Sequence, residues 1–166
     1  MRLELPASLE LMDPLEEVVV RLVRSEGVSE DDAYGIQVAF HEALTNAVRH
    51  GCRCDRRHRI RVAVRLAQSQ LRMLVVDPGS GFDPDRLPDP LAAENLGRGG
   101  GRGVFYMRRF ADHVAFRFPS SGGTAVSIVK RLHRATGAAV RSRGAISGDG
   151  IAAASEPSRR RRRRRP

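Results

Sequence analysis

A carboxylate and a carboxamide four residues apart are the first candidates for chemistry in this sequence. Glu42 and Asn46 lie within the segment Phe-His-Glu-Ala-Leu-Thr-Asn-Ala-Val-Arg-His-Gly, and Arg49 follows Asn46 three residues later. Residues three and four apart on a helix are neighbours, so we expect these three side chains, together with His50, to form one polar strip. A carboxylate can act as a general base, and a carboxamide can bind a metal ion. Taken alone, the strip is also what a solvated helix face presents.

A second candidate follows an apolar segment, in Asp77-Pro-Gly-Ser-Gly-Phe-Asp. A carboxylate at the end of a strand can be held partly buried and can accept hydrogen bonds from a ligand amine. Gly79 and Gly81 permit tight backbone turns and the close approach of a ligand. An ordinary turn between a strand and a loop is the alternative interpretation of this segment.

A third candidate is the glycine-rich segment that starts at Leu96. Gly101, Arg102 and Gly103 stand at its end and lead directly into a predicted helix. Backbone N–H groups at the start of a helix bind anions, and an arginine adds positive charge there. A flexible hinge has the same composition, so this segment by itself is weak support for a site.

Taken together and in this order, the three segments resemble the N box, G1 box and G2 box of the GHKL ATPase superfamily, which share the Bergerat ATP-binding fold. In detail the sequence is most similar to the anti-sigma-factor serine kinases. These are small bacterial proteins that phosphorylate anti-anti-sigma partners. The resemblance covers roughly residues 1–133 and includes Gly-Gly-Thr-Ala-Val-Ser-Ile-Val-Lys-Arg-Leu near its end.

The resemblance implies a role for each candidate residue. Glu42 matches the general base that activates a substrate serine, and Asn46 matches the ligand of Mg²⁺. Asp77 matches the residue that accepts a hydrogen bond from the adenine amino group of ATP. Further nucleotide contacts are implied at Arg49, Gly79, Gly81, Gly101, Arg102, Gly103 and Thr124.

The elements that must position these residues follow from periodicity. Asp13 as N-cap, Pro14 and Glu16 predict the start of a helix that stops at Gly27. A second helix is predicted from Ser29 to about residue 50, with apolar residues at helical spacing on one face. This second helix carries the polar strip, so it is the element on which the candidate site depends.

Strands are predicted where apolar residues alternate. They lie at about residues 3–5, 60–66, 71–77, 114–118 and 124–132, with the second and third joined as a hairpin and a short helix at 104–110. Residues 78–102 are predicted to be a long loop. This order predicts an α/β (α+β) two-layer sandwich, with a mixed, mainly antiparallel sheet and helices on one face.

Charge divides the chain of 166 residues into two parts. The net charge is +10, of which residues 135–166 carry +7 and residues 1–134 only +3. Large apolar residues are nearly absent after residue 134, so we predict one domain over 1–134 and a disordered tail over 135–166. The run Arg159–Arg165 is expected to bind nucleic acid weakly at most. The absence of a long apolar segment predicts a cytoplasmic protein with no membrane partner.

Several other classes of site are excluded or disfavoured. A P-loop needs Gly-Lys-Ser/Thr, and Lys130, the one lysine, stands in a different context. A set of possible metal ligands at His50, Cys52, Cys54 and His58 has no zinc-site spacing. We do not expect a histidine kinase, because the 41 residues before Glu42 are too few for a phospho-accepting helix pair, or a MutL- or gyrase-like ATPase, which needs a transducer domain.

We therefore expect an ATP-dependent serine/threonine protein kinase that uses ATP and Mg²⁺. The resemblance implies that it acts as an anti-sigma factor in partner switching. It would bind a sigma factor, phosphorylate a small anti-anti-sigma antagonist and form a homodimer. The alternative is a regulatory binding module in which the nucleotide sets the shape of the protein without phosphoryl transfer. An intact base at Glu42 argues for the kinase.

Overall fold

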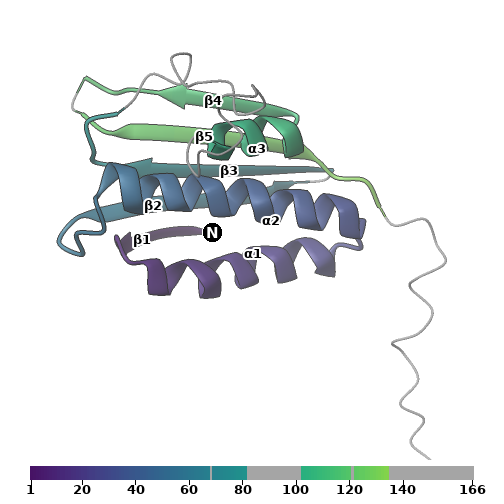
Figure 1. Cartoon of the computed structure of the whole chain (residues 1–166). Coiled ribbons are helices and arrows are strands. Elements are labelled where there is room, and N and C mark those ends of the chain that lie inside the picture. The colour runs from purple at the N-terminus through teal and green to yellow at the C-terminus, as the bar shows by residue number, and fades with distance from the viewer. Residues whose placement is uncertain (68, 82–101, 121, 135–166) are drawn as a thin grey trace, which may run out of the picture.

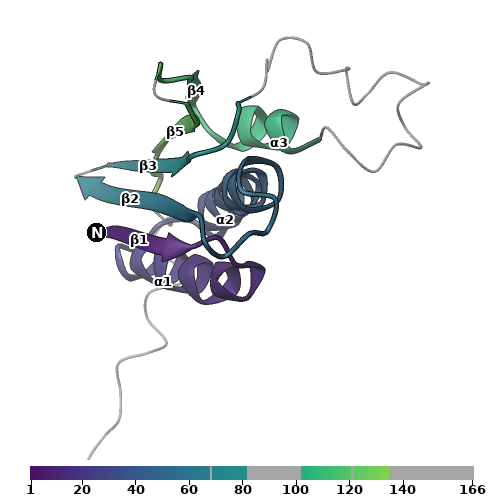
Figure 2. The same ribbon diagram turned by 90° about the vertical axis from the view of Figure 1, so that its left-hand side faces the viewer.

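The structure is a computed structural model that describes residues 1–67, 69–81, 102–120 and 122–134. It has two layers, a five-stranded sheet and three α-helices that all cover one face of it (Figure 1; Figure 2). The strand order is β1-β2-β3-β5-β4. The elements are β1 (Arg2–Pro6), η1 (Leu9–Leu11), α1 (Met12–Ser25), α2 (Glu30–Thr45), η2 (Asn46–Gly51), β2 (Arg59–Ala67), β3 (Gln70–Asp77), α3 (Arg102–Phe110), β4 (His113–Arg117) and β5 (Thr124–Arg131).

The predicted sandwich is confirmed, and within the described strands every pairing in the sheet is antiparallel. The sheet is therefore not mixed as predicted, since no parallel pairing occurs among the described strands. β3 and β4 are joined through α3 and run in the same direction, because both are antiparallel to β5. β5 lies between them, so the two strands do not pair with each other. The end of β3 and the start of β5 therefore become neighbours.

The predicted start of the first helix was wrong, because the helix begins two residues earlier, with Leu11 and not Asp13 as its N-cap. Asp13 is not the N-cap, because the single turn η1 leads directly into α1, and Leu11 already has helical dihedral angles, φ −89° and ψ −7°. Asp13 instead lies in the first turn, where its negative charge suits the helix dipole. The predicted stop is confirmed, since Gly27 has φ +69° just beyond the helix.

The second predicted helix is confirmed as α2. The Ser29 side chain accepts a hydrogen bond from the backbone N–H of Asp32 at 3.2 Å, which caps the helix. Its predicted apolar face is buried, and the residues concerned are Ala33, Ile36, Phe40, Ala43 and Ala47. One feature was not predicted: the last turn, η2, is a π-helix.

The end of β5 is fixed to the start of α2 by contacts around the buried Asp32 carboxylate. The Asp32 carboxylate contacts Lys130 Nζ at 3.1 Å and accepts the backbone N–H of His133 at 2.7 Å. The His133 ring lies 2.9 Å from the same carboxylate. Burial alone would raise the pKa of Asp32, but the bonds from His133 and the Lys130 ammonium together lower it. The described chain ends at this cluster.

Three expectations lie wholly or largely outside the described residues. They are the long loop predicted over 78–102, of which residues 82–101 are not described, the phosphate contact at Gly101, and the tail 135–166. Among the residues that the structure does describe, no helix combines the length and the apolar character needed to cross a bilayer.

Candidate functional site

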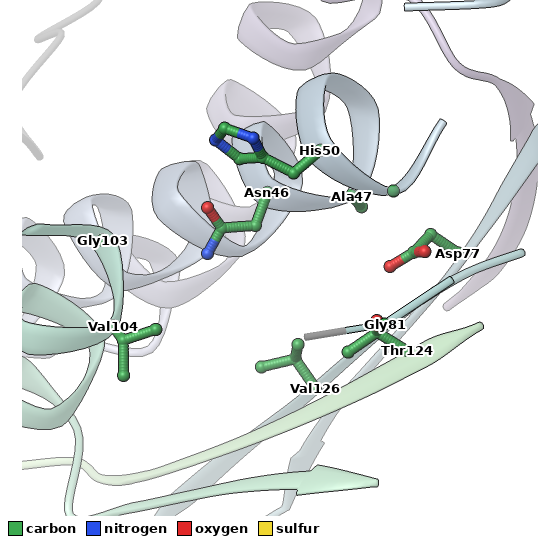
Figure 3. A pocket seen from close by; sticks show the side chains of 10 residues that line it. Asn46, Ala47, His50, Asp77, Gly81, Gly103, Val104, Thr124 and Val126 are labelled. Atoms are coloured by element: carbon green, nitrogen blue, oxygen red, sulfur yellow. The ribbon is translucent and has the colours of Figure 1, made fainter. Parts of the chain in front are cut away.

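A cavity of about 260 Å³ lies between the end of the long helix, the start of α3 and the sheet (Figure 3). Its polar lining comes from η2, β3 and β5 and consists of Asn46, His50, Asp77 and Thr124. Small or apolar residues form the rest, namely Ala47, Gly51, Gly81, Gly103, Val104 and Val126. Five of the predicted site residues therefore surround one cavity, although they come from four separate segments of the chain.

Asp77 is the buried carboxylate of this cavity, with 6% of its surface exposed. It ends β3 opposite Thr124, the first residue of β5. The backbone N–H of Gly79 donates to Asp77 Oδ1 at 2.8 Å, and Thr124 donates through its backbone N–H and its hydroxyl. Burial raises the pKa of Asp77, and these three hydrogen bonds offset part of that rise. An ionised carboxylate has about four acceptor positions, so capacity remains for a donor in the cavity.

Glycines allow the turn after Asp77 to close against η2. A Cβ atom at Gly79 would lie 2.5 Å from the carbonyl oxygen of Gly51 and 2.8 Å from Asp77 Oδ1. A Cβ atom at Gly51 would overlap the Asp77 side chain itself. Gly81 adopts φ +77°, a conformation that favours glycine. The close contact of Gly51 with Asp77 was not predicted from the sequence, where Gly51 only follows the predicted end of the second helix.

The predicted base and the predicted carboxamide meet at the start of α3. A Cβ atom at Gly103 would lie 2.7 Å from Glu42 Oε2 and 3.4 Å from Asn46 Nδ2. Asn46 and Gly103 lie at one end of the cavity and Asp77 at the other (Figure 3). Glu42 is half-buried beside Gly103 and is not itself part of the lining. The cavity thus joins an acceptor at one end to a carboxylate and an amide at the other.

The π-helical turn brings Asn46, Ala47 and His50 to the cavity together. The sequence placed His50 on the same polar strip and among possible metal ligands, but no role in the nucleotide site was predicted for it. The available signal was its spacing, because residues four apart on a helix share a face. Arg49 of the same turn is exposed and lies outside the lining, and Arg102 is half-buried at the start of α3.

Nothing in the described part of the chain supports the metal set that includes the two cysteines. No group of three or more His, Cys, Asp or Glu side chains suited to a metal occurs among the described residues. Cys52 is buried, and burial together with the nearby Asp77 and Asp55 carboxylates and Cys54 raises the pKa of its thiol to about 11.

The sequence matches a family model described as a histidine kinase-like ATPase domain, over residues 5–130. The chain belongs to the histidine kinase-like ATPase family. As a member of an ATPase family, this protein uses a nucleotide, and the cavity that Asp77 and Asn46 line is the candidate place for it.

Curated relatives of this histidine kinase-like ATPase carry the name serine-protein kinase RsbW. The relative from Bacillus licheniformis is 28% identical over 141 residues, which cover 78% of this chain and 83% of the relative. The relative from Bacillus subtilis strain 168 is 25% identical over 138 residues, with 79% and 84% covered. The relative from Staphylococcus epidermidis is 27% identical over 139 residues, with 80% and 86% covered.

Two solved structures have a similar fold. The SiaB–SiaC complex from Pseudomonas aeruginosa contains a chain that matches with a TM-score of 0.61 and 14% identity, covering 78% of this chain and 88% of that one. The RsbU and RsbW domains of Rv1364c from Mycobacterium tuberculosis match with a TM-score of 0.57 and 22% identity. That match covers 81% of this chain and spans only 33% of the mycobacterial chain. At these identities the likeness supports the two-layer fold.

Proposed function

We propose that this protein is an ATP-dependent serine/threonine protein kinase that acts as an anti-sigma factor in partner switching. The observation that carries the proposal is the meeting of Glu42, Asn46 and Gly103 at the end of the cavity opposite Asp77. The names of the curated relatives support the activity, because each is a serine-protein kinase. The structure of the SiaB–SiaC complex supports a protein partner, since its similar fold occurs there in a complex.

The residues around the cavity fit ATP. Asp77 offers a buried acceptor for the adenine amino group, and Ala47 and Val126 offer apolar surface to the base. Gly79 and Gly81 allow the turn after Asp77 that borders the cavity, because a Cβ atom at Gly79 would meet the backbone of Gly51 and Gly81 has φ +77°. In the proposal, Thr124 supports Asp77, and the phosphates lie near Arg49, Gly101, Arg102 and Gly103.

Mg²⁺ fits at Asn46, whose amide oxygen is a suitable ligand at the phosphate end of the cavity. Bound there, the ion would neutralise negative charge on the phosphates. Glu42 then accepts the proton of the partner's serine hydroxyl as that oxygen receives the phosphoryl group, and ADP is released. Phosphoryl transfer depends mainly on positioning and charge neutralisation, which a rigid helix and the start of α3 supply.

The proposed partners are a small anti-anti-sigma antagonist, which is the substrate, a sigma factor and a second copy of the chain. Exposed apolar side chains support a homodimer along one edge of the molecule. Val18 and Leu22 of α1 are 52% and 37% exposed, and Leu3 of the edge strand β1 is 37% exposed. We further propose a cytoplasmic location, a kinase domain over residues 1–134 and a disordered tail over 135–166.

Phosphoryl transfer to a candidate antagonist tests the activity. The antagonist is taken from the gene neighbourhood, incubated with the full chain, ATP and Mg²⁺, and analysed by intact mass and phosphosite mapping. We expect one phosphate on a serine or threonine. Glu42→Gln should slow transfer by at least about 10²-fold, the usual contribution of a general base. Glu17→Gln, an exposed carboxylate on α1, is the matched control and should leave the rate unchanged.

Two outcomes would contradict the proposal in different ways. Equal transfer by the wild type and Glu42→Gln would remove Glu42 from the chemistry. Nucleotide-dependent binding of the antagonist without any transfer would favour the regulatory binding module instead.

A further inference from the structure

The face of the sheet opposite the helices carries many arginines. Positions such as Val62, Met73 and Val126 are buried beneath the helices, so the alternate positions of the same strands face outward (Figure 2). Seven exposed arginines occupy these outward positions, namely Arg2, Arg59, Arg61, Arg65, Arg72, Arg117 and Arg131. The outward positions of the five strands hold one carboxylate, Glu4.

The strand register arranges these arginines around an apolar strip. Arg61, Val76, Ala125 and Arg117 are successive partners across β2, β3, β5 and β4. At the usual spacing between strands, the two arginines stand about 14 Å apart with apolar residues between them. The next outward row has no charged side chain on these four strands and includes Leu74, which is 38% exposed, while Arg2 of β1 stands beyond Ala63 at the end of the row.

The row after that restores the positive charge. Arg65, Arg72, Val129 and His113 are successive partners across the same four strands. The sheet face therefore has a defined pattern, which we call the arginine-framed strip. Leu74, Val76 and Val129 form its apolar centre, and the seven arginines surround it.

A hollow at one end of the arginine-framed strip collects three of the arginines. Its volume is about 470 Å³, and its lining consists of Arg65, Ala67, Ser69, Gln70, Arg72 and Arg131. Arg72 Nε donates to Gln70 Oε1 at 2.8 Å, and no lining residue is acidic. At the edge of the sheet, the Asp112 carboxylate accepts the backbone N–H of Arg131 at 2.6 Å. The hollow offers several guanidinium groups to an acidic side chain.

Most of the seven arginines form no ion pair within the described part of the chain, so their positive charge can attract a partner. Within the described residues, a single ion pair involves the seven arginines, between Arg59 Nε and Glu4 Oε1 at 2.9 Å. Arg61, Arg65, Arg72, Arg117 and Arg131 have no carboxylate partner for their side chains in that part of the chain. A surface with one sign of charge attracts a partner of the opposite sign.

We propose that the arginine-framed strip binds an acidic amphipathic helix of a partner protein. An α-helix with its side chains is about 10–12 Å wide, which fits between arginines about 14 Å apart. The apolar side of such a helix covers Leu74, Val76 and Val129, and acidic residues on its flanks reach the arginines. The strip lies on the face of the sheet opposite the cavity, so this binding does not depend on the kinase activity.

The same pattern disfavours the other occupants. A second copy that used this face would bring arginines against arginines, which is unfavourable. Nucleic acid makes no use of an apolar strip, and the outward positions of the described strands hold no aromatic residue on which a base could stack.

Binding of two labelled peptides to the full chain tests the proposal. One peptide of about 18 residues places leucines along one helical face and glutamates on its flanks. The other has the same composition in an order that cannot form an apolar face. Both carry the same charge, so the run Arg159–Arg165 attracts them equally. By fluorescence anisotropy we expect the amphipathic peptide to bind at least about tenfold more tightly.

Substitutions on the strip should remove that preference. Leu74→Glu removes apolar surface and adds a repulsive charge, and Arg72→Glu reverses a charge on the hollow. Each should reduce the preference to about twofold or less. Arg56→Glu changes an exposed arginine before β2 and is the matched control, so it should keep the full preference. Thermal melting shows whether each variant folds. If Leu74→Glu does not fold, Arg72→Glu alone tests the proposal.

Four outcomes would overturn the proposal. The two peptides could bind equally, or the strip variants could keep the preference. A DNA duplex could bind more tightly than the amphipathic peptide and be weakened by the same variants, which would identify nucleic acid as the occupant. Sedimentation could show that Leu74→Glu dissociates a dimer, which would identify a second copy. ATP binding by the same variants should be unchanged, which separates this test from that of the proposed function.

Discussion

At the scale of single residues, the buried position of Asp77 disfavours the ionised form of its carboxyl group. Burial raises its pKa above the ordinary value of 3.8, and the hydrogen bonds from Gly79 and Thr124 offset that rise only in part. The folded state therefore binds the proton more tightly than the unfolded state does. It follows that Asp77 costs stability above its raised pKa, and that this cost disappears as the pH falls through that pKa.

Asp77→Asn should therefore stabilise the protein in the absence of nucleotide. At neutral pH we expect the melting temperature to rise by about 2–5 °C, because a neutral side chain replaces a buried charge. The difference from the wild type should shrink as the pH is lowered, since the wild-type carboxyl group becomes neutral in both states below the ordinary pKa. Thermal melting over a pH series measures both effects. A lower melting temperature at neutral pH would show that the hydrogen bonds outweigh the burial.

Half of the ten residues that line the cavity were among the predicted site residues, on the strength of their motifs and of the family resemblance. Asn46, Asp77, Gly81, Gly103 and Thr124 were predicted and line one cavity. The role of Gly51 could not be predicted, because its value lies in a contact with the distant Asp77.

At the scale of elements, the contact between α2 and α3 sets the position of Glu42. Gly103 belongs to the first turn of α3, and a Cβ atom there would lie 2.7 Å from Glu42 Oε2. Further along the same pair of helices, a Cβ atom at Gly35 would lie 3.2 Å from Phe110 Cδ1. The two glycines therefore form a matched pair, one beside the proposed base and one far from it.

Gly103→Ala should impair phosphoryl transfer far more than it impairs folding. The Glu42 side chain can move away from a new methyl group, so we expect a loss of rate of at least about tenfold with little change in melting temperature. Gly35→Ala should keep the transfer rate, because the Phe110 ring lies away from the cavity. Transfer rates and melting curves of both variants provide the measurement. Equal transfer rates for the two variants would show that the contact between Gly103 and Glu42 is not needed for catalysis.

Periodicity predicted the order of the elements but not the details of their ends. The start of α1 differs because the turn η1 precedes it, and nothing about Asp13 reveals a helical turn before it. The π-helical turn η2 could not be predicted either, because its polar and apolar residues follow the spacing of an ordinary α-helix. These local features decide which side chains reach the cavity, as His50 shows.

At the scale of the whole molecule, the proposed boundary at residue 134 places most of the net positive charge in the tail and the nucleotide site in the domain. Residues 135–166 hold nine arginines against two acidic residues, which accounts for +7 of the net charge of +10. The contacts of His133 with Asp32 and the β-bridge between Val28 and Arg134 lie before this boundary.

Truncation after Arg134 should therefore leave ATP affinity unchanged within about twofold. The melting temperature should change little, because the contacts of His133 remain. Weak binding of DNA at low salt should be lost with the arginines, since that binding depends on charge. Calorimetry, thermal melting and a salt series provide the measurements. A large fall in ATP affinity would place part of the nucleotide site in the tail.

The proposed ATP site depends most on the recognition of adenine by Asp77. Calorimetric titration of the full chain with ATP and with inosine triphosphate, which has a carbonyl oxygen in place of the adenine amino group, tests it most directly. We predict that the wild type binds ATP at least about tenfold more tightly, because inosine triphosphate presents an acceptor oxygen to the buried carboxylate where ATP presents the amino donor. Asp77→Asn should lose this preference. Equal affinity of the wild type for the two nucleotides, or an unchanged preference in Asp77→Asn, would contradict the account.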